Sequence, residues 1–503
     1  MSRTKAKTKR KQQDVQDGGP AKKVKAAAII ALTPAASEPK SVQTLIPDED
    51  LEITTETLTI LAENPGLIKS KACKDLRTAV FDFRKACTTG FNASGELSSA
   101  PPAKAAIADQ IIVDANLTSR ISGALADGGY IEARVLLAEM RIREQVPKLG
   151  ALCRWVRDLD VVSGLAEQIG GGSTRTPREV ELLKVLDAIL RATGPIDFTA
   201  DNIDGTGPMA VQKEWDLRGG KDIARTYDSV LDQTIFSCLP DDITSRFRVI
   251  QTTPGVERKP PNLHPAILYA SQDNTISFSA TPPDTSHHHH PTVPNLHLLK
   301  DVLSREECNQ IIGAAEKIGF TPDAPIRAEG EEISILAHNF YWIVDEAFHR
   351  GLWARVARFV PAEINGQKAR GLNRRFRVYR YVPGAEYRAH IDGAWPPSGI
   401  DPQTDAYIYD NSPPAAKQSS LFTFLIYLND EFDAGETTFF LPAAREGCMN
   451  AYQVKPIQGS VALFPHGETE GSLLHEGTGV RRGGEGRNAK YVIRTDVLYD
   501  VDS

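Results

Sequence analysis

The first half of the chain carries hydrophobic residues at helical spacing. Between about positions 48 and 195, apolar side chains recur every three to four residues, and glycines and a proline mark the ends of the periodic segments. Such a stack of helices either binds protein partners or buttresses a neighbouring domain, and the sequence leaves both open. The pattern predicts a mainly helical domain over 48–195, with helices over 70–91, 117–129, 130–146, 149–165 and 177–193.

From position 296 onward the pattern changes to strand-like runs that follow two helices. One helix is predicted within 296–320, where Ser304 and Glu307 have the spacing of a capping box, and a second over 345–361. Strands behind helices predict an α+β fold in which helices brace a sheet sandwich. The predicted strands cover 375–382, 421–430, 436–442, 460–465 and 490–500.

The region 196–295 has no sustained pattern. It contains two short strand-like pieces, 247–252 and 266–271, and then the stretch 279–295, which is rich in proline, serine and threonine. We interpret 279–295 as a linker or exposed loop. His287–His290 within it have a metal-binding composition, but without rigid partners we interpret them as low-complexity decoration.

The charge of the chain is segregated, which changes how its net value of −7 is interpreted. The first 25 residues hold nine lysines and arginines against two aspartates, so the remainder is acidic. An acidic body argues against nucleic-acid binding by the folded part. Six scattered cysteines without a C-x-x-C pair indicate reduced thiols, and no apolar run is long enough to span a membrane.

Residues 1–47 predict a disordered basic tail. Its basic clusters at 7–11 and 20–25 have the spacing of a bipartite nuclear localisation signal, for which the partner is a nuclear import receptor. The other interpretation is a solvated tail with non-specific contacts to nucleic acid. We expect the protein in the nucleus, the cytoplasm or both.

The stretch YRAHIDGAW at 387–395 offers candidate metal ligands. His390 and Asp392 are two positions apart at the end of a predicted strand, so both side chains can face the same side. A third ligand on a distant strand would complete a two-histidine, one-carboxylate set for Fe(II). His475, in LLHEG, is our choice, with His466, in FPHG, as the fallback.

A cosubstrate with a free carboxylate, such as 2-oxoglutarate, would need a buried cation near this site. Lys490 and Arg494 are four positions apart on one predicted strand and share a face, and Tyr427 lies on another strand. A buried cation is costly unless an anion pairs with it, which favours an acidic ligand here. The alternative is an edge strand with both cations in water.

These residues carry a resemblance to a known family. The region from about 296 to 500 resembles the prolyl 4-hydroxylase-like branch of the Fe(II)/2-oxoglutarate-dependent dioxygenases through LKDVLSREECNQII, RFRVYRYVPGAEYRAHID, FLIYLND, AGETTFF, GSVALFPHG, LLHEG and KYVIRTDVLY. The resemblance implies a dioxygenase domain over 296–503 with a double-stranded β-helix, or jelly roll, and flanking helices. It also implies Fe(II), 2-oxoglutarate and O2, with ascorbate as a further cofactor.

The resemblance assigns roles position by position. The gap from His475 to the basic residue is fifteen positions, where the family has about ten, so either Lys490 or Arg494 can be the main 2-oxoglutarate anchor; we favour Lys490 with Arg494 as a helper. The implied metal ligands are His390, Asp392 and His475; the implied cosubstrate residues are Lys490, Arg494, Tyr427 and Tyr381; and Tyr387 and Trp395 are expected at the substrate pocket.

The implied reaction is hydroxylation of a C–H bond with release of succinate and CO2. Asp392 favours hydroxylation, because a small residue there would leave room for a halide. The family name suggests a protein or peptide substrate of prolyl type. Six residues separate Arg487 from Arg494, so this pair does not have the Arg-x5-Arg spacing of nucleobase demethylases. The alternatives are a helical scaffold or sensor with a slow oxygenase domain, and a small-molecule oxygenase. The Pro-rich stretch 395–420 is either a lid over the substrate or a surface loop.

Overall fold

The computed structural model divides the chain into two compact units, Met1–Ala108 and Asp109–Ser503. In the first unit the principal described element is helix α2, Asp48–Glu63. The predicted basic tail and most of the predicted helix over 70–91 lie outside the described residues. The structure describes residues 48–64, 73, 76–77, 79–80, 117–165, 175–199, 207–220, 223, 225–259, 261–326, 337–467, 469, 471–481 and 488–501. Within these ranges, no helix combines the length and apolar character that a membrane span requires.

In the second unit, four of the helices in the described ranges form a layer at the positions the periodicity predicts, although each ends a few residues early. Their apolar stripes form one core with the smaller of the two main sheets, whose Phe440, Met449 and Ala451 belong to the same cluster. This packing places the helices and the sheet in one compact unit. The helices are α6 (Leu117–Ala126), α7 (Tyr130–Ile142), α8 (Leu149–Leu159) and α10 (Pro177–Arg191).

The helical layer is also joined to the small sheet by polar contacts. Arg191 at the end of α10 is buried, donates to Asp187 over 2.7 Å, and donates to the carbonyl of Arg445 over 2.7 Å. The amide of Ala389 donates to the carbonyl of Val161, which follows α8, over 3.0 Å. The five strands of the small sheet, in spatial order, are β1 (Met209–Val211), β15 (Met449–Val454), β14 (Thr437–Pro442), β17 (His475–Gly477) and β10 (Tyr387–His390).

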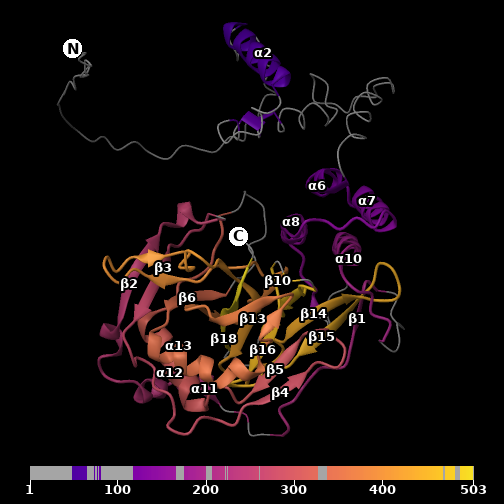
Figure 1. The fold of residues 1–503 in the computed structure, drawn as a ribbon. Coiled ribbons are helices and arrows are strands. Elements are labelled where there is room, and N and C mark those ends of the chain that lie inside the picture. Colours follow the sequence, from indigo (N-terminus) through magenta and orange to yellow (C-terminus); the bar gives the residue numbers. More distant parts are fainter. Residues whose placement is uncertain are drawn as a thin grey trace, which may run out of the picture. The chain divides into compact units, whose positions relative to one another are not determined.

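The larger sheet has eleven strands and shares a second core with the small sheet. Figure 1 shows the strands of both sheets. Tyr381 and Tyr427 of the large sheet share this core with Phe439 of the small one. The spatial order is β2 (Phe247–Thr253), β3 (Ala266–Ser271), β6 (His338–Ile343), β9 (Arg375–Tyr381), β18 (Lys490–Asp500), β13 (Gln418–Tyr427), β16 (Val461–Pro465), β5 (His297–Lys300) and β4 (Ser286–His289), with β8 (Gln367–Leu372) on β18 and β7 (Glu363–Ile364) on β8.

Helices cover the outer face of the large sheet. The two predicted helices appear there, and Ser304 and Glu307 form the predicted capping box. Together with the sheets they give the mixed α+β architecture that the sequence predicts. The outer elements are α12 (Arg305–Ile318), α13 (Glu346–Val356), α11 (Thr226–Leu231) and the 3-10 turns η2 (Thr234–Cys238), η3 (Ile243–Arg246), η4 (Gly255–Glu257) and η5 (Ala357–Phe359), while β11 (Gly399–Ile400) and β12 (Tyr407–Ile408) form a separate hairpin.

The interpretation of 279–295 as a linker is corrected by the structure. Residues Ser286–His289 form strand β4, which pairs with β5 at the end of the large sheet. The reason is local: the His290 ring nitrogen Nδ1 accepts from the amides of Thr292 and Val293, and the amide of His290 donates to the carbonyl of Leu296. The fourth histidine of the run thereby closes the hairpin. The domain boundaries expected after residues 47, 195 and 295 stay predictions.

Candidate metal centre

Three side chains meet where the small sheet opens toward the large one. His390 ends β10 and His475 begins β17, and the two residues are direct cross-strand partners. Asp392 follows two residues after His390, with its carboxylate oxygens 3.4 Å from His390 Nε2 and 3.6 Å from His475 Nε2. The three ligand atoms lie within 4.8 Å of one another. The predicted set is therefore assembled, and His475 rather than His466 belongs to it.

The backbone sets the tautomers of both histidines. His390 Nδ1 lies 2.6 Å from the carbonyl of Arg388, and His475 Nδ1 lies 3.2 Å from the carbonyl of Leu473. A carbonyl only accepts, so each Nδ1 carries a proton, and Nε2 is the ring nitrogen that faces Asp392. Burial, together with the neighbouring His390, lowers the pKa of His475 to about 3, which keeps this imidazole neutral.

Asp392 is held as a carboxylate. Burial opposes its ionisation, but Arg494, whose Nη1 lies 3.0 Å from Oδ1, keeps the pKa of Asp392 well below its usual value. Arg494 also donates to Asp496 and to the carbonyl of Gly393. Two imidazoles and one carboxylate on one side form the donor set that suits Fe(II) with open positions opposite. The residues present therefore fit this metal.

A hydrogen-bonded chain supports Asp392 from behind. Thr423 donates its hydroxyl to Asp392 Oδ2 over 2.7 Å, so at 2.6 Å the Nδ1 of His466 must donate to Thr423. The Nε2 of His466 then accepts from Ser420 over 2.8 Å, and Ser420 accepts from the amide of Trp395. His466, the fallback ligand, is thus connected to Asp392 indirectly, through the hydroxyl of Thr423. The sequence suggested His466 only as an alternative metal ligand, and nothing in it marked Thr423 or Ser420.

Lys490 lies at the other end of the same cavity. Lys490, Val492 and Arg494 all line it, as the alternation along β18 requires. The Lys490 ammonium donates to the carbonyl of Gly435 over 2.6 Å, and among the described residues no carboxylate forms an ion pair with it. Burial lowers the pKa of Lys490 to about 8, partly offset by Glu436. Arg494, by contrast, is already paired with two aspartates.

The predicted aromatic residues differ in position. Tyr381 and Tyr387 line the cavity, and the Lys490 Nζ lies 5.3 Å from the centre of the Tyr381 ring. Tyr427 stands behind the wall, because its hydroxyl donates over 2.8 Å to Thr437, which does line the cavity. Sequence reasoning missed Thr437, since a threonine within a buried strand carries no distinguishing signal.

Trp395 lies beside the cavity, next to a smaller hollow that it shares with Arg494. The Arg375 guanidinium stands 4.4 Å from the centre of the Trp395 ring. After Trp395 the stretch 395–420 forms the β11–β12 hairpin, and Ile400 and Tyr407 pack against a core cluster of β3 and β6. This loop is therefore anchored along part of its length.

Comparison with known proteins agrees with this geometry. Residues 376–495 match the 2OG-Fe(II) oxygenase superfamily, and the matched segment contains all three residues of the triad and both basic candidates. The C-terminal region is a 2OG-Fe(II) oxygenase domain. The protein is accordingly a 2-oxoglutarate-dependent dioxygenase, and the family resemblance stated from the sequence is confirmed for this region.

The chain also has detectable similarity to solved structures. A viral collagen prolyl hydroxylase from Paramecium Bursaria Chlorella virus-1, solved with 2-oxoglutarate, is 17% identical over 41% of this chain and 97% of its own, with a TM-score of 0.26. A 2OG-Fe(II) oxygenase from Burkholderia pseudomallei is 16% identical over 41% and 84%, with a TM-score of 0.25. A Pseudomonas putida prolyl-4-hydroxylase is 16% identical over 43% and 92%, with a TM-score of 0.23. No curated protein matched the chain.

Proposed function

We propose that the oxygenase domain hydroxylates a C–H bond of a protein side chain, prolyl in type, and releases succinate and CO2. The observation that carries the proposal is the triad, in which two Nε2 lone pairs and one carboxylate converge within 4.8 Å. The prolyl assignment is supported by the resemblance of the motifs around the triad to the prolyl 4-hydroxylase-like branch. His390, Asp392 and His475 would hold the iron.

Fe(II), 2-oxoglutarate and O2, when bound, supply the oxidising chemistry. The chain positions them. The Lys490 ammonium would take the far carboxylate of 2-oxoglutarate, because it is the buried cation of the cavity without an anionic partner among the described residues. Thr437 would donate a second hydrogen bond, with its own hydroxyl oriented by Tyr427. Arg494 would hold Asp392 ionised rather than contact the cosubstrate.

The surroundings of the triad keep its geometry fixed. The Phe464 ring meets the His475 ring edge-on at 4.7 Å, and the neighbouring Phe439 ring stacks against His475 at 5.7 Å. These rings exclude water from one side of the site and restrict the imidazole to one orientation. A fixed, partly dry site is what an open iron centre requires from its protein.

The test is succinate formation by the full chain supplied with Fe(II), 2-oxoglutarate and ascorbate. Wild type should form succinate even without substrate through slow uncoupled turnover, and His390→Ala or Asp392→Ala should reduce the rate at least about 100-fold, because loss of a ligand exceeds the 10- to 100-fold effect of a lost outer partner. His288→Ala is the matched control: it removes a histidine that is half-buried on another strand and bonded only to Ser286 among the described contacts. If the wild-type protein binds no iron and forms no succinate, the proposed hydroxylase activity is excluded.

The substrate is tested separately. An inactive Asp392→Ala chain should retain protein partners, and those partners should gain the mass of one oxygen on a prolyl residue when wild type replaces the variant. Oxygen gained only by small molecules would establish the small-molecule oxygenase instead. Iron binding with partner binding but without any product would establish the sensor or scaffold.

A further inference from the structure

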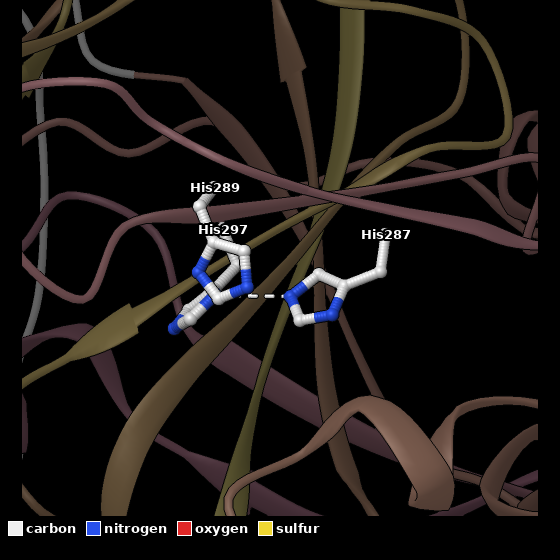
Figure 2. A group of neighbouring side chains, drawn as sticks. All are labelled: His287, His289 and His297. Atoms are coloured by element: carbon white, nitrogen blue, oxygen red, sulfur yellow. Dashed lines mark hydrogen bonds between the residues drawn. The ribbon is translucent and has the colours of Figure 1, made fainter.

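A second cluster of three histidines lies outside the oxygenase centre. His287 and His289 on β4 and His297 on β5 bring their ring nitrogens within 4.8 Å of one another. The ring centroids are separated by 4.4, 4.6 and 5.0 Å, and Figure 2 shows the rings gathered at one place with a hydrogen bond between two of them. The sequence run therefore has the rigid partner that it lacked when taken as a linker.

The strand register explains why these three rings meet. His289 is directly opposite His297 in the antiparallel pair, and His287 is two residues before His289 on the same face. His288 points to the other face, where it bonds Ser286. Since β4 is the last strand of the sheet path and His289 is exposed, an ion can reach the cluster from solvent.

The cluster is held in place on both sides. His297 is buried on β5, which is paired on its far side with β16. His290 closes the hairpin through two backbone amides and packs against the rings of Trp215 and Tyr452 at 4.8 and 5.4 Å. The fourth histidine of the run is thus structural, while the first and third remain available as ligands.

The spacing suits tetrahedral coordination. With Zn–N bonds of about 2.0–2.1 Å, two imidazole nitrogens on one tetrahedral ion are about 3.3 Å apart. His287 Nε2 and His297 Nδ1 lie 3.0 Å apart, so a small ring movement would replace their shared proton by an ion.

The cluster and the oxygenase centre lie on opposite faces of the large sheet. Leu298 belongs to the core between the sheets, together with Phe464, whose ring contacts His475. Leu299 belongs to the outer core with α12 and α13, and His297 shares its face by strand alternation. His287 accordingly packs against Phe359 of η5, 5.6 Å away. The two sets of ligands therefore cannot share one ion.

We propose that His287, His289 and His297 form a second metal site that binds Zn²⁺ or another late first-row divalent ion with a water in the fourth position. Three imidazoles without a carboxylate favour this class over Mg²⁺ or Ca²⁺, which take oxygen ligands. Three protein ligands and one open position match a zinc site that exchanges its fourth ligand. The site is independent of the iron centre and of its proposed substrate.

The test uses Zn²⁺ with the metal-free full chain in an Asp392→Ala background, so that the oxygenase triad is disabled. This protein should bind one Zn²⁺. Adding His289→Ala should weaken binding at least about 100-fold, since even outer partners of a metal site contribute 10- to 100-fold. Adding His288→Ala instead should change the affinity less than about twofold, because this neighbouring histidine faces away.

Two further measurements keep the test decisive. Co²⁺ in the same protein should give the intense visible bands of a tetrahedral ion, and His289→Ala should remove them. His390→Ala provides a second background if Asp392→Ala does not fold. Thermal melting should show that replacing the exposed His289 by alanine leaves the fold intact. Equal Zn²⁺ affinity in all variants, or no binding by a folded background protein, would mean that the cluster is a hydrogen-bonded histidine pair and nothing more.

Discussion

The two histidine clusters use the same strand geometry for different purposes. In each, two histidines face each other across antiparallel strands, His390 with His475 and His289 with His297. In the oxygenase centre the third group is a carboxylate, whereas at the sheet edge it is His287. The carboxylate adds negative charge and a harder ligand, which favours Fe(II), and three imidazoles favour a tetrahedral zinc-like ion.

The clusters also differ in what surrounds them. Both histidines of the oxygenase centre have Nδ1 occupied by a backbone carbonyl, and Asp392 is bonded by Arg494 and Thr423. At the edge of the large sheet, His287 and His297 form a hydrogen bond with each other, and among the described residues no backbone carbonyl orients the two nitrogens that form it. The strand positions of the ligands therefore determine which side chains can share one ion. The surrounding hydrogen bonds orient those side chains for a particular metal.

Among the residues that support the two sites, Lys490, a buried cation of the oxygenase cavity, should have the largest effect. Lys490→Ala should raise the 2-oxoglutarate concentration for half-maximal succinate formation by about 10- to 150-fold, because a charge-assisted hydrogen bond contributes about 1.5–3 kcal/mol. Lys490→Arg should recover part of the loss. An unchanged requirement in Lys490→Ala, with a raised one in Arg494→Lys, would make Arg494 the anchor.

Next in size is the support of Asp392 by the hydroxyl of Thr423. Thr423→Val keeps the shape of the side chain but removes the donor to Asp392 Oδ2 and the acceptor for His466. Affinity for Mn²⁺, as a stand-in for Fe(II), should fall about 10- to 100-fold in a calorimetric titration. Thr438→Val is the matched control, since this buried hydroxyl bonds Thr478 instead. Equal affinities in the two variants would show that Thr423 only packs.

The binding of 2-oxoglutarate at the oxygenase centre should depend on pH through Lys490. Burial lowers the pKa of Lys490 to about 8, so in the free enzyme the ammonium is present below pH 8 and is lost above it. A carboxylate binds the charged form. The affinity for 2-oxoglutarate should therefore be constant below pH 8 and fall about tenfold for each pH unit above it, until the pKa of the complex is reached. Lys490→Arg should remove this fall; its persistence would assign it to another group.

The residues that the structure brings together at the candidate centre could be named from the sequence because their signals are local and mutually consistent. His390 and Asp392 are two apart, Lys490 and Arg494 obey strand alternation, and Ser304 with Glu307 begins α12. What was missed depends on pairing between strands. Thr423 reaches Asp392, and His297 reaches His289, only because two strands are in a particular register. The register between two strands cannot be inferred from the sequence of either strand alone.

The smallest predicted effect tests how far the support of Asp392 extends. Ser420 donates to His466 Nε2, two hydrogen bonds further from Asp392 than Thr423. Ser420→Ala should weaken Mn²⁺ binding only about two- to fivefold, because a neutral hydrogen bond contributes about 0.5–1 kcal/mol and reaches the metal indirectly. Ser419→Ala, a half-buried neighbour on the same strand, is the matched control. If Ser420→Ala weakened Mn²⁺ binding as much as Thr423→Val, the series of hydrogen bonds from Trp395 to Asp392 would act as one unit. The loop that begins at Trp395 would then be coupled to the metal.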